Sequence, residues 1–504
     1  MATPSEKLAE SLEALRAIQK SGADAIRSGD LSRTHRERLL ENGFLQEVMK
    51  GWYVPARPDE QAGQSTAWYA SFWGFCAAYL SDRFKQNWCL SPEQSLFLHT
   101  GKWTVPQQLL VRTPKGGNKP TDLPHGTSIF DVRASLPEAG QEETVNGLIV
   151  FSLPAALVQI GPGMFRANAT DVRAALAVMQ DESEILSMLL NGGHSVIAGR
   201  LAGAFRNIGR EKIADGILEG MKSAGYKVSE TDPFEEASSL LFATREASPY
   251  VTRMRLDWIA MRDDIVDVFP PPPEAAIDIK AYMQNVEDVY VTDAYHSLSI
   301  EGYRVSEELI QKVRDGTWNP DDEEDREHRN ALAARGYYDA FQVVKDSVRK
   351  VLNGANAGDT TDADHSKWYR ELFSPSVTAG ILQPGDLAGY RNGSVYVRQS
   401  MHTPPPKEGV RDLMPAFFNL LREEENPAVR IVLGHFMFVF IHPYVDGNGR
   451  MGRFLMNTMM ASGGYPWTVI TVDTRDQYMA ALEQASVNKN IKPFVEFLGE
   501  LMRA

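Results

Sequence analysis

One twelve-residue segment, His442–Arg453, constrains this 504-residue chain more than any other part of it. It reads HPYVDGNGRMGR, so a histidine, a carboxylate, two arginines and three glycines lie close together. An apolar run of about 13 residues precedes it, whereas strands favour roughly 5 to 6 residues. A second apolar run, Phe454–Met460, follows it and is expected to be helical. The sequence therefore predicts a loop that opens into a helix.

The residue types of this loop are suited to binding phosphate. Gly447 and Gly449 can take positive φ, so successive N–H groups can curl around anionic oxygens, and Asn448 would add side-chain donors. The start of the following helix would favour phosphate through its free N–H groups and its dipole. Arg450 and Arg453 lie three residues apart on one helical face, so both can reach the same polyphosphate.

Two further side chains suggest metal binding and proton transfer. Asp446 offers carboxylate oxygens suited to Mg2+, which usually binds through one or two carboxylates plus phosphate oxygens. His442 is the only side chain of the loop whose ordinary pKa lies near neutrality, so it is the expected general base.

This segment resembles the signature of the Fic family, HPFxDGNGRxGR, with Tyr444 in place of phenylalanine. The family transfers AMP from ATP to a protein hydroxyl, and glycine at position 449 favours AMP transfer because a related phosphate-transferring branch carries lysine there. An aromatic residue near the adenine often stands at the place of Tyr478, although a core position fits that residue equally well. The resemblance implies that His442 is the general base and that Asp446 is the Mg2+ ligand. It assigns the phosphate cradle to Gly447, Asn448 and Gly449. Arg450 and Arg453 would bind the outer end of the phosphate chain.

A dinucleotide-binding turn is the alternative for the same loop. The letters GNGRMG also form G-x-G-x-x-G, and Asp473 follows an apolar run about 20 residues later. The long apolar run before the loop, the two arginines and His442 argue against this interpretation. Too little chain follows Asp473 to complete a second nucleotide-binding half.

A second motif lies upstream, where residues 297–302 read SLSIEG. It resembles the inhibitory motif of the Fic family, S/T-x-x-x-E-G/N, which is matched by Ser297, Glu301 and Gly302. The resemblance implies that Glu301 pairs with Arg453 and keeps the γ-phosphate of ATP from binding in its proper place. The carboxylate occupies the bidentate donor site of the Arg453 guanidinium that phosphate oxygens need. Release is expected to require a helix shift, since an opened pair leaves a desolvated glutamate. Taken alone, the pattern also fits a helix end beside a glycine.

A hairpin is predicted over Gly389–Val397, because Asn392-Gly393 is a strong turn signal between β-forming residues. The segment resembles the Fic flap, which aligns a target segment by strand addition beside the catalytic histidine. An ordinary hairpin fits the same residues. The resemblance assigns target docking to Gly393, Ser394, Val395 and Tyr396.

The first 60 residues are predicted to form a winged helix-turn-helix. Apolar spacing indicates a helix over Leu8–Ile18, a short second helix is expected near Ala23–Arg27, and Ser32 can cap a third over Arg33–Glu41. A hairpin over Phe44–Pro55 follows. The basic surplus over residues 32–57 is only two, so DNA and protein both stay open as partners of this region. In a DNA complex the third helix would offer Arg33, Arg36 and Arg38 to a groove.

Four parts are expected along the chain, which is predicted to be mainly α. The winged helix-turn-helix over residues 1–60 precedes an α+β regulatory domain over 61–235, which loosely resembles AbiEi-type winged-helix antitoxins. A connector over 236–273 follows, and its last part, Arg262–Pro273, ends in four prolines and is expected to be a stiff linker. Residues 274–504 are expected to form an all-α catalytic domain of Fic type with a β-hairpin flap and the inhibitory helix.

Composition limits the partners and the compartment. The formal charge of −14 argues against a chain-wide grip on nucleic acid. Cys76 and Cys89 are too few for a disulfide framework, which fits a reducing cytoplasm. No signal peptide or apolar run of membrane-spanning length is recognised, so no membrane partner is expected.

The sequence thus predicts a protein adenylyltransferase that moves AMP from ATP to a Ser, Thr or Tyr hydroxyl, with Mg2+ as cofactor. Pairing of Glu301 with Arg453 is expected to restrain it. The alternative is a DNA-binding regulator or a toxin–antitoxin fusion whose Fic domain responds to nucleotide. The expected partner is a protein with a hydroxyl side chain, while operator DNA and a second copy of the chain stay open.

Overall fold

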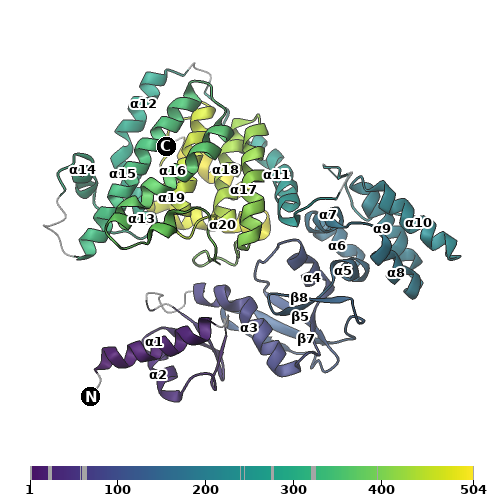
Figure 1. Cartoon of the computed structure of the whole chain (residues 1–504). Coiled ribbons are helices and arrows are strands. Elements are labelled where there is room, and N and C mark those ends of the chain that lie inside the picture. The colour runs from purple at the N-terminus through teal and green to yellow at the C-terminus, as the bar shows by residue number, and fades with distance from the viewer. Residues whose placement is uncertain are drawn as a thin grey trace. The chain divides into compact units, whose positions relative to one another are not determined.

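The computed structural model describes residues 3–20, 25–56, 58, 65–238, 240–242, 245–273, 277–318, 325–393 and 395–502. The chain is mainly helical, as predicted, and its small sheets lie in the N-terminal half (Figure 1). It divides into two compact units. Unit 1 contains Met1–Leu256 and Val395–Thr403, and unit 2 contains Asp257–Ser394 and Pro404–Ala504.

Unit 1 begins with a small module composed of α1 (Pro4–Lys20), β1 (Ile26–Arg27), α2 (Arg33–Glu41), β2 (Leu45–Met49) and β3 (Trp52–Pro55). Its strands pair antiparallel in the order β1-β3-β2. Ser32 caps α2 as predicted, because its Oγ accepts from the His35 N–H at 3.2 Å. The short helix predicted near residues 23–27 is wrong at Ile26 and Arg27, which form β1. The reason is tertiary: Ile26 is fully buried against Leu15, Leu31, Leu39 and Leu45.

The next part of unit 1 combines helices with two small sheets. Its elements are α3 (Thr66–Phe84), β4 (Cys89–Leu90), α4 (Pro92–His99), β5 (Gln108–Thr113), β6 (Pro120–Asp122), η1 (Pro124–Gly126), β7 (Ser128–Arg133), β8 (Glu142–Val145) and β9 (Leu148–Phe151). One sheet has the order β4-β5-β7-β6, in which β5 and β7 are parallel, and the other is the β8–β9 hairpin.

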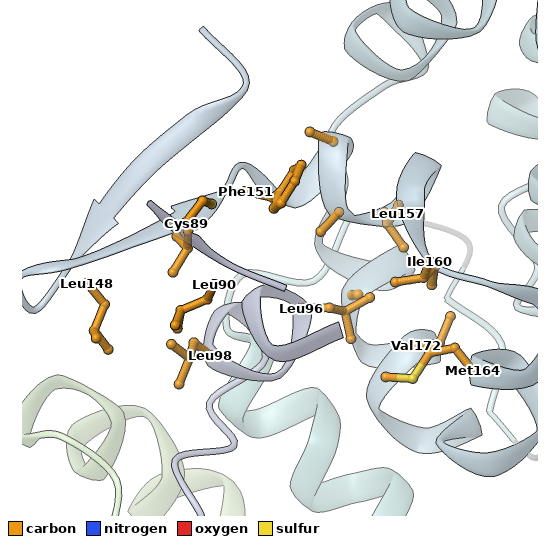
Figure 2. Packing of buried hydrophobic residues seen from close by; sticks show 14 of the residues in the cluster. Cys89, Leu90, Leu96, Leu98, Leu148, Phe151, Leu157, Ile160, Met164 and Val172 are labelled. Atoms are coloured by element: carbon orange, nitrogen blue, oxygen red, sulfur yellow. The ribbon is translucent and has the colours of Figure 1, made fainter. Parts of the chain in front are cut away.

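Helices complete unit 1 after the sheets. They are α5 (Leu153–Gln159), α6 (Pro162–Ala167), α7 (Ala169–Val178), α8 (Ser183–Gly192), α9 (Ser195–Asn207) and α10 (Glu211–Ser223). Figure 2 shows how strand and helix residues share one apolar cluster, in which Leu96 of α4 lies among side chains such as Leu157 and Val172. The two later sheets and the helices of unit 1 that follow them therefore share one apolar core.

The connector between the predicted domains contains a long helix, α11 (Pro249–Val268). Residues 262–268 were expected in a stiff linker, and this part of the prediction is wrong. Arg262 lies in α11 and forms an ion pair with Glu424 at 3.2 Å, so packing within unit 2 extends the helix toward the prolines. Beyond it, the Tyr465 hydroxyl donates to the Pro270 carbonyl at 2.7 Å.

The regular elements of unit 2, within its described residues, are all helices. Its elements are α12 (Ile279–Asp288), α13 (Tyr290–Ile300), α14 (Glu307–Arg314), α15 (Asp325–Leu352), α16 (Ala357–Thr378), η3 (Pro384–Leu387), α17 (Lys407–Glu423), α18 (Pro427–Ile441), α19 (Asn448–Ser462), η4 (Val472–Thr474), α20 (Arg475–Asn488) and α21 (Lys492–Leu501). The run before the glycine loop is thus helix α18, which excludes the strand that a dinucleotide-binding turn requires.

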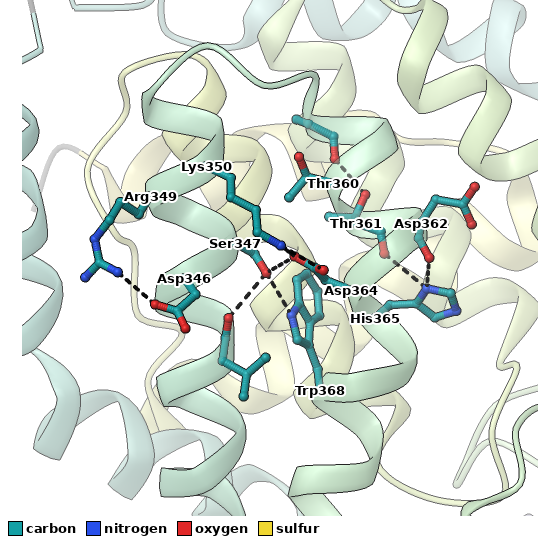
Figure 3. Close-up of polar contacts among 12 residues, drawn as sticks. Asp346, Ser347, Arg349, Lys350, Thr360, Thr361, Asp362, Asp364, His365 and Trp368 are labelled. Carbon is teal, nitrogen blue, oxygen red and sulfur yellow. Dashed lines mark hydrogen bonds and ion pairs between the residues drawn. The ribbon is translucent and has the colours of Figure 1, made fainter.

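Polar contacts join the long helices α15 and α16 (Figure 3). The Ser347 hydroxyl donates to Asp364 at 2.7 Å and accepts from the indole N–H of Trp368 at 3.1 Å. Lys350 also binds Asp364. These contacts hold α16 against α15. Among the helices of the described ranges, none combines the length and the apolar character that crossing a bilayer requires.

Candidate active site

The loop between α18 and α19 is held by its own residues. His442 (φ 53°) and Gly447 (φ 78°) have left-handed backbones and reverse the chain at the two ends of the loop. The Asn448 side chain accepts from the Tyr444 N–H and donates to the Tyr444 carbonyl, both at 2.9 Å. Asn448 was expected to offer side-chain donors to phosphate, but here both of its polar groups are used to fold the loop.

The two central glycines are required for different reasons. Gly447 precedes α19 with positive φ, and its N–H donates to Asp446 Oδ1 at 2.6 Å. Gly449 lies inside α19, so the positive φ expected for it is wrong. A Cβ at position 449 would lie 2.2 Å from Glu301 Oε1. Glycine at this position therefore leaves room for the Glu301 carboxylate.

His442 has the tautomer that a general base needs. Its Nδ1 lies 3.2 Å from the Val439 carbonyl, and a carbonyl oxygen can only accept, so Nδ1 carries the proton. The lone pair of the neutral ring is therefore on Nε2. Burial lowers the pKa of His442 to about 4. The imidazole is consequently neutral, and able to accept a proton, at physiological pH.

Arg391 fixes the backbone around His442, a role that no sequence motif indicated. Its guanidinium donates to the carbonyls of His442 at 2.7 Å and Ile441 at 3.4 Å, and its N–H donates to Pro443 O at 2.9 Å. These carbonyls lie at the C-terminal end of α18, where a cation is favoured. Burial lowers the pKa of Arg391 to about 10, so it stays charged. Arg391 lies beside the predicted turn, but its partners lie about fifty residues later in the chain.

Arg453 and the upstream motif are brought together as the sequence predicted. Arg453 Nε donates to Ser297 Oγ at 2.7 Å, and one terminal nitrogen donates to Ser297 O at 3.0 Å and to Glu301 Oε1 at 2.8 Å. The other terminal nitrogen, Nη1, is buried without a hydrogen-bond partner. Gly302 follows with φ 88° and ends the turn after α13.

The charges of this pair determine the protonation of Glu301. Burial by itself would raise the pKa of Glu301, but the guanidiniums of Arg453 and Arg450 outweigh it, so that the pKa lies below its ordinary value. Glu301 is therefore a carboxylate at neutral pH. The Arg453 side chain is 3% exposed and that of Glu301 25%, so solvent screens the pair only from the glutamate side.

Arg450 is buried by aromatic rings. Its side chain is 1% exposed, and its guanidinium carbon lies 5.1 Å from the Phe373 ring centre and 5.2 Å from that of Tyr303. Its one recorded carboxylate contact is with Asp446 Oδ2 at 3.6 Å, and its Nε has no hydrogen-bond partner. The described structure thus holds two buried arginines with unsatisfied donors beside one loop.

Asp446 is the loop residue that could hold a metal ion. Its side chain is 65% exposed, and one of its oxygens already accepts from the Gly447 N–H. Such an open carboxylate suits Mg2+, which keeps several waters and completes its shell with phosphate oxygens.

Aromatic contacts support the loop from α16. Tyr369 stacks on Tyr444 with ring centres 3.9 Å apart and an interplanar angle of 9°. His365 Nε2 lies 2.9 Å from the Tyr390 hydroxyl, while its Nδ1 faces the carbonyls of α16 that Figure 3 shows. The position of Tyr444 is therefore set by stacking as well as by Asn448.

Tyr478 lies in the core rather than at a free surface. The residue is 1% exposed, and its hydroxyl lies 2.7 Å from His435 Nε2. In this conformation Tyr478 therefore occupies a core position, which was one of its two predicted places. Its contact with adenine stays a prediction. Burial raises the pKa of Tyr478 to about 12, so its hydroxyl stays protonated.

The hairpin predicted over Gly389–Val397 is not formed by strands in the described residues 389–393 and 395–397. Its first arm is bound to the end of α18 through Arg391. Gly393 lies in unit 2, whereas Val395 and Tyr396 belong to unit 1, and Ser394 lies outside the described residues. The docking role of these residues stays a prediction.

Contacts within unit 1 explain the missing second arm. The Gln399 N–H donates to Thr66 Oγ1 at 3.0 Å, and the Val105 N–H donates to Met401 O at 3.0 Å. The backbone of residues 395–403 is thus held by unit 1 instead of pairing with the first arm. A local turn signal cannot reveal such distant partners.

The three arginines predicted to contact DNA make contacts within their own module. Arg33 is exposed and pairs with Glu37 at 2.7 Å. Arg36 donates to the Ser28 carbonyl at 2.6 Å, and Arg38 donates to the Lys7 carbonyl at 2.7 Å. DNA binding through α2 stays a prediction, with Arg33 as its most accessible cation.

Comparison with known proteins agrees with the geometry of unit 2. Residues 363–460 match the Fic/DOC family. The chain carries a Fic/DOC domain. Among proteins named "Protein adenylyltransferase Fic", one from Nematostella vectensis is 25% identical over 265 residues, which are 52% of this chain and 57% of that protein. One from Drosophila melanogaster is 30% identical over 218 residues, which are 42% of this chain and 41% of that protein.

The chain thus spans about half the length of the curated Fic relatives it matches. A solved structure of Fic-1 from C. elegans is 18% identical and covers 67% of this chain and 89% of that chain, with a TM-score of 0.36. A TM-score this low supports no structural conclusion. The match to the Fic/DOC family includes α18, the glycine loop and most of α19, but not the motif around Glu301.

Proposed function

We propose that this chain is a protein adenylyltransferase that moves AMP from ATP to a hydroxyl side chain of a target protein. The observation that carries the proposal is the composition of one loop region. A neutral histidine with its lone pair on Nε2 lies at the end of α18, and the glycine loop connects it to α19, which carries two buried arginines that retain unpaired N–H donors. Phosphate oxygens are the acceptors that suit such donors best.

The proposed step is an in-line displacement at the α-phosphorus. The target oxygen forms a bond to phosphorus while its proton passes to His442 Nε2, and the bond to the bridging oxygen breaks to release pyrophosphate. The backbone N–H groups at the start of α19 and the two arginines would balance the charge of the phosphates. Mg2+, when held by Asp446, would supply further neutralisation of phosphate charge.

The proposal includes restraint by the upstream motif. Glu301 occupies an N–H donor of Arg453 that a phosphate would need, and Gly449 leaves space for that carboxylate. Separating the pair would leave the poorly solvated Arg453 without a counter-charge, so opening requires either a moved helix end or an incoming phosphate. The protein is therefore expected to have low basal activity.

Labelled ATP tests both parts of the proposal. ATP that carries its label on the α-phosphate is incubated with the chain and a cell lysate, and labelled protein is identified by mass. Glu301→Gly should increase labelling by roughly tenfold or more. His442→Ala in that background should reduce it by about 10² to 10⁴. Absence of a mass increase corresponding to AMP in the Glu301→Gly reaction would refute the proposed chemistry.

A further inference from the structure

Tyr303 has a fixed position relative to Glu301. Its N–H donates to the Leu298 carbonyl at 3.1 Å, which closes the turn after α13. Gly302, between the two residues, supplies the left-handed backbone of that turn. Any movement of the chain that withdraws Glu301 from Arg453 therefore moves the Tyr303 ring as well.

Arg450 is covered by two rings that differ in their freedom to move. Phe373 belongs to α16, and a Cβ at Gly447 would lie 2.7 Å from its ring, so Phe373 is packed tightly beneath the loop. Tyr303 follows the end of α13 and is partly exposed. Since the Arg450 side chain is only 1% exposed, oxygens of a nucleotide can reach its N–H groups only if one cover moves. The cover that can move is Tyr303.

We propose that Tyr303 is a second restraining residue, which holds Arg450 under its ring while Glu301 holds Arg453. This inference rests on the proposed function and extends its regulation. One short segment would thereby withhold both arginines of the loop: one through an ion pair, the other through a cation–π contact. Arg329, whose guanidinium carbon lies 6.0 Å from the Tyr303 ring centre, stabilises the same ring position.

A binding experiment on the full chain tests this restraint without turnover. The α,β-methylene analogue of ATP cannot transfer AMP, so its affinity with Mg2+ reports access to the site. Tyr303→Ala should lower the dissociation constant by roughly three- to tenfold, because the closed state loses one desolvated cation–π contact. Tyr303→Phe keeps the ring and should bind like the parent protein. Tyr295→Ala is the matched control, since Tyr295 lies on α13 against the His296 ring.

The direction of the change decides between restraint and support. An unchanged or raised dissociation constant for Tyr303→Ala would overturn the inference, because a ring that positions Arg450 for phosphate would strengthen binding. Loss of stability alone cannot tighten binding, and thermal melting of each variant checks folding. Glu301→Gly is measured in parallel: if it binds no analogue, the proposed function fails and this inference with it. If it binds while Tyr303→Ala stays neutral, only this inference fails.

Discussion

Helix α2 and the start of α19 both present arginines at helical spacing, yet the surroundings of these arginines differ. On α2, Arg36 and Arg38 use their guanidiniums on carbonyls of their own module. At α19, Arg450 and Arg453 are nearly inaccessible and each retains a donor without a partner. A buried unsatisfied donor is costly, so two of them beside one glycine loop support the proposed phosphate site, which helical spacing alone cannot indicate.

The largest expected effect on nucleotide binding concerns Arg453. In the Glu301→Gly background, Arg453→Ala should weaken binding of the Mg2+ complex of the ATP analogue by roughly 10- to 100-fold, because hydrogen bonds to charged groups contribute about 1.5–3 kcal/mol. The measurement is titration calorimetry. Arg36→Ala in the same background is the control and should leave the affinity unchanged. Equal effects of the two variants would remove the distinction drawn between the two helices.

The second prediction concerns folding and compares Arg391 with Arg36. Arg391→Met should lower the free energy of unfolding by about 3 kcal/mol, because the carbonyls of Ile441 and His442 at the end of α18, and that of Gly393, lose their donor. Arg36→Met should cost about 1 kcal/mol, since Arg36 is half-buried and loses one hydrogen bond to a carbonyl and a cation–π contact with Tyr53. Urea denaturation measures both. A smaller loss for Arg391→Met than for Arg36→Met would contradict the burial argument.

The third prediction concerns the pKa of His442, which burial lowers to about 4. A lowered pKa means that the ring is neutral above that value and becomes charged only in acid. An NMR titration of the ring signal, assigned with His442→Gln, should show no protonation between pH 8 and about pH 5.5. A midpoint near the ordinary value of about 6.5 would show that the imidazole is hydrated.

The smallest expected effect concerns Arg33, whose partner Glu37 is also exposed. Arg33→Ala should leave the melting temperature unaltered, because exposed pairs contribute little to stability. If α2 contacts DNA, the variant should weaken retention on the chain's own promoter at low salt, measured by fluorescence anisotropy. Unaltered retention would leave α2 without a DNA role.

In the candidate active site, the sequence indicated which residues lie together, but it indicated only some of the contacts that these residues make. The roles proposed for His442 and Asp446 follow from their chemistry, and the pair of Glu301 and Arg453 was predicted from two matched motifs. The use of Asn448 was not predictable, because one side chain can serve either a ligand or its own loop. The contact between the Tyr303 ring and Arg450 was not predictable either, because it depends on where α13 ends relative to α19.

Among the elements, the helix over residues 33–41 and the hairpin over 44–55 were predicted correctly, whereas the short helix near 23–27 and the hairpin over 389–397 were not. Helix α2 and its Ser32 cap depend on neighbouring residues, so they could be recognised locally. Strand β1 depends on burial of Ile26 against residues from other elements. The segment after Gly393 likewise follows its contacts in unit 1 rather than its turn signal.

The sequence by itself determined that this chain has a helix-flanked glycine loop with a base, a carboxylate and two arginines, because glycine backbone freedom and helical spacing are local properties. Tertiary structure alone decided which donors remain unpaired. Burial by Phe373, Tyr303 and Glu301 brings residues far apart in the chain around one loop, and desolvation there sets both the protonation of His442 and the accessibility of Arg450.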